Sequence, residues 1–482
     1  MGLRSDFLIL ADDMFLKRFF HNSVSLLQKN YFFAISFLAT LAYFLLGVVS
    51  FRFGAFFVFL AMIIYLCHHR FCFGIFLKDI SVIWFGILSY IGVLFMALLS
   101  VYFSADKFGT LDKIEIFLIL PFFLMLFFYV LVKNLEQKAF YLFSFFFSVA
   151  ILSQPFATIY HYFTINSDRV VGFGDVSIIP YSLFLLLSFA LCVSMIIYLK
   201  GRFKIFSCLL LCVSLFAMYA NGTRALILCV VVMVFAMMVL FRNEINKKIS
   251  VAISLSMFLV LLGGYFSSTY FGERFNFKKI FSHIGTVWSY APAQMGRFDK
   301  NCFKEDSDYN CSKLSGDKLD ERFSFESNSL NRLSLWKSAY VAIMKNPLIP
   351  NGFYSRFFNK NLSNIIKPDS MDYFYPRDKY TNAGYYTHMH NMILSFLFEL
   401  GIVGFLLIIA IFFAIFRSFI LFLHRTNNLY EKLLVSSGIL FLVGFWISMF
   451  FDSIISFSNT NYTFFALLGI FLGISHRRDS CQ

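Results

Sequence analysis

The feature that most constrains this chain is a series of apolar runs, each about 16–25 residues long and separated by polar segments. Coiled as a helix, such a run crosses a hydrocarbon core about 30 Å thick. In lipid the backbone must satisfy its own hydrogen bonds, which favours helices. A membrane β-barrel would instead show segments of about 10 residues with alternating polarity. The sequence therefore predicts an all-α, polytopic membrane protein.

The composition agrees with a membrane protein. Of the 482 residues, 59% are hydrophobic and only 14% are charged, whereas a soluble domain carries about 25% charged residues. The net charge of +14 would suit nucleic-acid binding. However, the Lys and Arg residues are scattered between apolar runs, as charges that set membrane topology are, and form no cluster. We therefore expect membrane lipids, and no nucleic acid, as partners.

The apolar runs predict about twelve transmembrane helices, of which the second and the eighth are short. The expected spans are 31–49, 53–67, 80–103, 114–132, 139–160, 177–199, 205–220, 225–241, 249–266, 391–416, 433–450 and 459–475. The expected organisation is a cytoplasmic N-terminus at 1–30, transmembrane helices 1–9 at 31–266, a large periplasmic loop at 267–389, transmembrane helices 10–12 at 390–475, and a cytoplasmic C-terminus at 476–482.

Basic residues predict the orientation, because cytoplasmic loops carry an excess of Lys and Arg. One set of alternate segments holds about 18 of them, among them Lys17, Arg18, Lys29, Arg70, Lys78, Lys133, Lys138, Lys200, Arg202, Lys204, Arg242, Lys247, Lys248, Arg417, Arg425, Lys432, Arg477 and Arg478. The opposite short loops hold five, namely Arg52, Lys107, Lys113, Arg169 and Arg224. Both termini are therefore expected in the cytoplasm. The opposite loops, with the candidate site residues, would then face the outside, which is the periplasmic face of the inner membrane if the host is a Gram-negative bacterium.

The long segment 267–389 differs from the rest of the chain because it is polar and carries both signs of charge. We expect it to face the periplasm and to fold as a small helical or mixed subdomain. Cys302 and Cys311 both lie in this segment. In an oxidising compartment two nearby cysteines can form a disulfide, and two free thiols are the alternative.

Three arginines are expected at or beyond the outer membrane face, where they oppose the topology bias: Arg169, Arg224 and Arg332. A guanidinium group is a forked, permanently charged donor that suits phosphate oxygens. The alternative is that each arginine only extends to lipid headgroups. This alternative is weaker for Arg224, because a charge at membrane depth is usually functional.

The stretch Thr387-His388-Met389-His390-Asn391 leads into the tenth expected span. If a helix starts at His390, rotation by about 100° per residue puts His390, Gly401 and Gly404 on one stripe. The glycines would then let another helix approach closely. A neutral imidazole accepts a proton near pH 7, which makes His390 a candidate base. The alternative is an interfacial histidine with no chemical role.

Other candidate motifs are weaker. His388 and His390 are two residues apart, which is no helical ligand spacing, and no carboxylate motif accompanies them. Asp306-Ser307-Asp308 resembles the acidic motif of metal-dependent sugar transferases, but a solvated surface explains it more simply. The chain carries no Walker loop and no dinucleotide fingerprint. We therefore expect neither a metal nor another cofactor.

The histidine motif resembles the signature of a known family. His390-Asn391, nine residues, Gly401, two residues and Gly404 are similar to the signature of the O-antigen ligase family. The wider group also includes O-antigen polymerases and bacterial protein O-oligosaccharyltransferases.

The arginine segments resemble the same family in the same order along the chain. Arg169-Val170-Val171-Gly172 is similar to its outer-loop arginine, and Asn221-Gly222-Thr223-Arg224-Ala225 to its Ser/Thr-Arg turn. The segments 332–336 and 346–352 are similar to the stretch before the second half of its loop. The resemblance extends from about Arg169 to the end of the tenth span.

This resemblance implies a metal-independent membrane glycosyltransferase with a GT-C-like helical fold. It implies that a glycan on undecaprenyl diphosphate is the donor and that lipid A–core is the acceptor. His390 would be the base for the acceptor hydroxyl. Arg224 and Arg332 would clamp the diphosphate as its negative charge grows, with Arg169 as a third contact. An aromatic-rich cavity could hold the prenyl chain, although contact with bulk lipid explains the many Phe residues more simply.

Other functions remain open on the sequence alone. Within the group, an O-antigen polymerase or a protein O-oligosaccharyltransferase differs only in its acceptor. A flippase or transporter of lipid-linked glycans belongs to another class, and it predicts paired charges near the midplane and broken helices in matching halves. A membrane scaffold without enzymatic activity would need no arrangement of the histidine and the arginines.

Overall fold

A computed structural model describes about half of the chain. The described residues are 83–104, 106–165, 170–172, 178–245, 336–337, 339–353, 390–451 and 458–477. Within these ranges only the backbone is described for 178–180, 224 and 458–459. Several predictions lie outside the described residues: the spans 31–49, 53–67 and 249–266, both chain ends, most of the segment 267–389, Arg169, Arg332, Cys302 and Cys311.

Among the described residues the regular structure is helical and contains no strand, which confirms the all-α class. The helices are α6 (Trp84–Phe103), α7 (Lys107–Ile114), the π-helix η2 (Glu115–Ile119), α8 (Leu120–Lys133), α9 (Gln137–Thr164), α10 (Ile178–Tyr198), α11 (Arg202–Asn221), α12 (Arg224–Leu240), α19 (Met392–Arg425), α20 (Leu429–Met449) and α21 (Ser458–Ser475). A further short helix covers 336–337 and 339–345.

Seven helices of the described part are long and apolar enough to cross a membrane, while α12 and α21 are apolar but shorter. The protein is therefore a multi-pass membrane protein. Each of the nine expected spans that fall within the described residues coincides with a helix. The eighth span is short, as expected. The total of twelve spans stays a prediction.

Two helices are longer than expected. The fourth span begins at Lys107 rather than near 114, because α7, η2 and α8 are continuous. The tenth span runs to Arg425, so Arg417 lies inside α19 and not in a loop. The physical reason is that α19 is broken at Gly401. Residues 402–425 alone form a helix about 36 Å long, which is enough to cross the bilayer.

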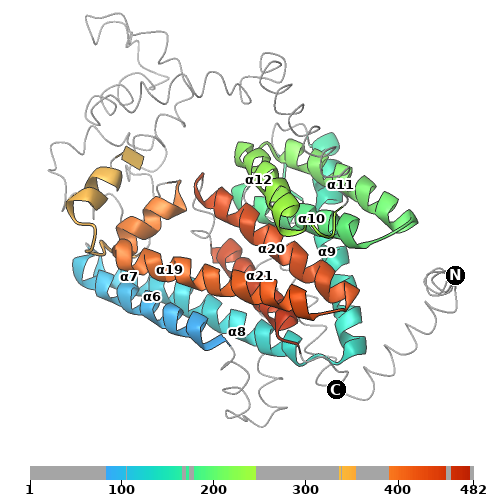
Figure 1. Cartoon of the computed structure of the whole chain (residues 1–482). Coiled ribbons are helices and arrows are strands. Elements are labelled where there is room, and N and C mark those ends of the chain that lie inside the picture. The colour runs from blue at the N-terminus through green and yellow to red at the C-terminus, as the bar shows by residue number, and fades with distance from the viewer. Residues whose placement is uncertain are drawn as a thin grey trace, which may run out of the picture.

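Helix α20 lies at the centre of the bundle (Figure 1). It packs against α10 and α12 on one side and against α19 and α21 on the other. Helix α6 packs along α19, α8 packs along α21, and α11 packs against both α9 and α10. Phenylalanine rings fill the contact between α20 and α21, where the rings of Phe445 and Phe464 stack 4.0 Å apart between their centroids.

Two glycines let α21 approach α8 closely. A Cβ atom on Gly473 would lie 2.8 Å from the carbonyl oxygen of Tyr129, and one on Gly469 would overlap the carbonyl oxygen of Met125. Gly469 and Gly473 are four residues apart, which is the small-xxx-small spacing of close membrane helix pairs. The pair α8–α21 therefore owes its tight packing to this spacing.

A buried ion pair joins four helices at one end of the bundle. Arg477 Nη1 donates to Glu431 Oε1 at 2.9 Å, and both side chains are at most 5% exposed. Arg477 Nη2 donates to Gln137 Oε1 at 2.8 Å, and the guanidinium lies 3.9 Å from the ring centroid of Phe140. Thr426 Oγ1 donates to Glu431 Oε2 at 2.9 Å. The sequence suggested a loop charge at Arg477, but here the side chain is an internal connection.

The basic residues around this ion pair allow the two ends of the bundle to be distinguished. We call the end that holds Lys133, Lys200, Arg425, Lys432 and Arg477 the basic end. Helices α8, α10, α19 and α21 end there, while α9, α11 and α20 begin there. The start of α19 and the turn between α11 and α12 are consequently both at the opposite end, which we call the histidine end.

We expect Arg477→Met to lower the free energy of unfolding by about 3–5 kcal/mol, because it leaves the Glu431 carboxylate buried without its ion-pair partner. Equilibrium unfolding of the purified protein in detergent measures this loss. Arg425→Met is the matched control, because Arg425 is exposed at the same end. The double variant Glu431→Leu, Arg477→Met should regain most of the loss. Equal stability of Arg477→Met and Arg425→Met would contradict the assigned role.

Candidate functional site

The candidate base lies just before helix α19. His390 is half-buried and has a φ of 50°, and Asn391 caps the helix by accepting a hydrogen bond from Leu394 N at 3.0 Å. The helix starts at Met392. An Asn side chain is a strong N-cap, which explains why the helix begins there and not at His390.

The stripe of His390, Gly401 and Gly404 does not form, because α19 is not continuous. Gly401 has φ 67° and ψ 177°, which lie outside the helical region and are accessible to glycine at little cost. The assumption of a regular helix from His390 to Gly404 was therefore wrong. A Cβ on Gly401 would meet the backbone of Leu348, whereas one on Gly404 would lie 3.4 Å from Met96 Cβ of α6.

A loop segment packs on the break in α19. Residues 346–353 follow the helix that covers 339–345 and contact α19 with their backbone. Phe353 N donates to Ser100 Oγ of α6 at 2.9 Å. Lys337 belongs to the short helix before residues 346–353 and lies five positions after Arg332. Partial burial lowers the pKa of its ammonium group. The segment that follows Arg332 therefore contacts the helix that follows His390.

A tight turn precedes Arg224. Helix α11 ends at Asn221, Gly222 takes the left-handed conformation with φ 68°, and α12 begins at Arg224. A left-handed C′ glycine is a common way to end a helix. The expected spans 205–220 and 225–241 leave only residues 221–224 between them, and the described backbone confirms this tight turn. The side chain of Arg224 lies outside the described part.

The turn before Arg224 is bonded to the segment after Arg169. Val170 N donates to Ala220 O at 3.3 Å, and Asn221 Nδ2 donates to Val170 O at 3.1 Å. Asn221 is fully buried, and its Oδ1 accepts a hydrogen bond from Thr223 Oγ1 at 2.6 Å. Residues adjacent to two of the three candidate arginines therefore lie together.

Helix α9 holds this segment from the other side. His161 Nδ1 lies 2.7 Å from Val171 O, so this nitrogen carries the proton and donates it. A Cβ on Gly172 would overlap the hydroxyl group of Tyr181, which explains why this position has no side chain. The Tyr181 hydroxyl also bonds to Thr158 and to the backbone of Gln154. A polar residue inside an apolar run, Gln154, is the sequence signal that could have pointed to these residues.

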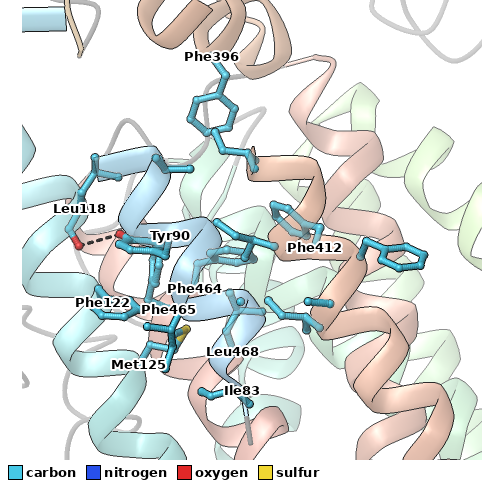
Figure 2. Close-up of a pocket in the computed structure, with 18 of the residues that line it drawn as sticks. Ile83, Tyr90, Leu118, Phe122, Met125, Phe396, Phe412, Phe464, Phe465 and Leu468 are labelled. Atoms are coloured by element: carbon cyan, nitrogen blue, oxygen red, sulfur yellow. Dashed lines mark hydrogen bonds between the residues drawn. The ribbon is translucent and has the colours of Figure 1, made fainter. Parts of the chain in front are cut away.

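A groove of about 470 Å³ lies between α6, α8, α19 and α21 (Figure 2). Phe396, Phe412 and Phe464 project into it. It extends along α19 from Met392 near the histidine end to Ser418. One of its walls is fixed by Tyr90, whose hydroxyl donates to Leu118 O at 2.8 Å. Its lining is mainly aromatic and aliphatic, as expected for a site that holds a hydrocarbon chain.

A few polar groups line the same groove. Glu399 is 5% exposed, and Ser395 lies one turn before it on α19. Asn461 Nδ2 donates to Phe117 O at 2.8 Å, which orients the carboxamide, and within the described part the Oδ1 atom has no hydrogen-bond partner. Carboxylate and amide oxygens accept hydrogen bonds, so this part of the groove suits a ligand with hydroxyl groups.

The described part of the chain contains no group of three or more metal-ligating side chains.

The histidine, the glycines of α19 and the turn before Arg224 lie at one end of the bundle, with α20 packed against both α12 and α19. Arg169, Arg332 and the Arg224 side chain stay predictions.

A comparison with protein families gives a match for this chain. The O-antigen ligase family model matches residues 209–409, which is less than half of the chain. The match confirms the resemblance inferred from the motifs, and it supports a glycosyltransferase-type function in O-antigen processing. It contains Arg224, Arg332, His390 and both α19 glycines, while Arg169 lies before it. No curated protein matches the chain.

We expect Asn221→Ala to lower the free energy of unfolding by about 1–3 kcal/mol, because Val170 O would lose a buried donor. Thermal or denaturant unfolding in detergent measures the change. Asn134→Ala is the matched control, because the Asn134 side chain is exposed and its Nδ2 atom donates to Val130 O at the end of helix α8. A loss no larger than that of the control would contradict a role for Asn221 in joining the two arginine segments.

Proposed function

We propose that this protein is a membrane glycosyltransferase. The premise is the O-antigen ligase match over residues 209–409. It transfers a glycan from undecaprenyl diphosphate to lipid A–core at the periplasmic face of the inner membrane. The observation that carries the proposal is the contact between the segment after Arg169 and the turn before Arg224. Two guanidinium groups held by adjoining backbone suit a diphosphate with its spread negative charge.

In the proposed reaction the acceptor hydroxyl oxygen attacks the anomeric carbon of the donor glycan. The bond between that carbon and the phosphate oxygen breaks, and undecaprenyl diphosphate leaves. His390 takes the proton of the attacking hydroxyl, since a sugar hydroxyl is a weak nucleophile without a base. Arg224, Arg332 and Arg169 stabilise the charge that collects on the diphosphate, so the reaction needs no metal.

The groove along α19 supports a lipid-linked substrate. Its apolar length accommodates a prenyl chain, and its lining starts at Met392, two residues after His390. A chain held there would place its head group beside the start of α19. The Asn461 Oδ1 atom offers a hydrogen-bond acceptor to a sugar hydroxyl near that head group.

A transporter of lipid-linked glycans is the alternative from another class, and the broken helix α19 is the observation that favours it. In transporters a broken helix leaves backbone groups facing an ion or substrate site. Here the break is covered by backbone from residues 347–351 of the same chain. This contact favours a structural break over a transport site.

We expect His390→Ala to abolish glycan attachment when a strain that lacks its own ligase is complemented with the variant. Lipopolysaccharide banding measures attachment, and immunoblotting of membranes confirms that the variant accumulates. His424→Ala is the matched control and should keep full activity, because His424 is exposed near the basic end. Normal banding with His390→Ala would exclude the histidine as the base. Wild-type complementation that yields longer glycans without attachment to lipid A–core would indicate a polymerase instead.

We expect Gly86→Phe to reduce transfer at least tenfold by filling the groove with a benzyl group. Gly86 lines the groove, and a Cβ there would meet no atom within 4 Å, so the helix should accept the new side chain. Leu88→Phe is the matched control, because Leu88 is 58% exposed on the same helix and does not line the groove. Equal transfer rates of the two variants would show that the groove holds no substrate.

A further inference from the structure

The break in α19 separates the two halves of one helical hydrogen bond. In an uninterrupted helix, Ile402 N would donate to Phe398 O four residues earlier. Gly401 turns the chain away between them with its φ of 67° and ψ of 177°. Phe398 is fully buried, so its carbonyl group needs another partner.

One segment of the long loop supplies both missing partners. Ile402 N donates to Pro347 O at 2.9 Å, and Asn351 N donates to Phe398 O at 3.1 Å. Asn351 Nδ2 donates to the same Phe398 oxygen at 3.1 Å. Residues 347–351 therefore replace the interrupted bond from outside the helix.

The Asn351 side chain makes two hydrogen bonds in this contact. Its Nδ2 atom also donates to Ile349 O at 3.2 Å, so one carboxamide both shapes the loop and attaches it to α19. The side chain is 6% exposed, which shields these bonds from water. The position of Gly401 matches this role, since a Cβ there would lie 2.8 Å from Leu348 O.

We propose that Asn351 is a positioning residue that sets the place of the helix covering 339–345, and so of the chain that leads from Arg332, relative to His390. The contact lies directly after the helix that covers 339–345, which follows Arg332 in the chain. On α19 it lies eight residues after His390, and Phe353 N continues it to Ser100 of α6. The proposal rests on the function proposed above, in which both residues act on one substrate.

The first experiment measures the contact without any assay of activity. Hydrogen–deuterium exchange of the purified full chain compares Asn351→Asp with Asn346→Asp, a control at an exposed position of the same segment. Asp at 351 replaces the donor with an acceptor facing Phe398 O, so the amides of Asn351 and Ile402 should exchange faster. Helices α10 and α20 should exchange as in the unchanged protein. Unaltered exchange at 347–353 and 398–402 would overturn the proposal.

The second experiment tests positioning through a double-mutant cycle with Arg332→Lys. Loss of the Asn351 bond should lower kcat/KM for transfer about tenfold in Asn351→Ala. If Asn351 acts by placing Arg332, the same change in the Arg332→Lys background should cost less than about twofold. A purely structural effect would multiply the two losses, and that result would overturn the positioning role.

The two experiments separate the failure of this inference from the failure of the proposed function. If no transfer activity is found for the unchanged protein, the glycosyltransferase proposal fails and the exchange experiment still decides whether Asn351 holds the contact. If transfer is found and Asn351→Ala transfers as fast as Asn346→Ala, the positioning role fails while the proposed function stands.

Discussion

One interrupted hydrogen bond determines the geometry of the histidine end. Because Gly401 separates Ile402 N from Phe398 O, helix α19 is divided into a short piece, 392–400, and a longer piece, 402–425. The longer piece is sufficient to cross the bilayer, so the short piece and His390 need not be part of the membrane span. The same interruption creates the place where residues 347–351 join the bundle.

The bundle keeps the two kinds of candidate group on different sides of α20. The turn before Arg224 belongs to the side with α10 and α12, while the groove and Glu399 belong to the side with α6 and α19. This separation keeps the Glu399 carboxylate away from the turn before Arg224, where a carboxylate would compete with a diphosphate for the guanidinium group. A substrate with an anionic centre and a hydrocarbon chain would therefore span both sides.

The helical class and nine of the expected spans could be predicted, because a run of apolar residues has few stable forms in lipid. The tight turn before Arg224 was also foreseeable, since the short interval between two apolar runs leaves no room for a loop. The break at Gly401 was not, because glycine is compatible with both a helical and a left-handed backbone. Contacts such as Asn221 with Val170, 51 positions apart, have no periodic signature in a sequence.

The groove has a consequence for how substrates arrive. Trp84 and Phe413 line it and are each more than 60% exposed, so the groove opens sideways along the hydrophobic surface. A lipid-linked molecule would enter by diffusion within the plane of the membrane and never pass through water. Saturation would then follow the surface density of the lipid rather than its bulk molarity. Rates compared between detergent preparations should accordingly be set against the mole fraction of substrate in each micelle.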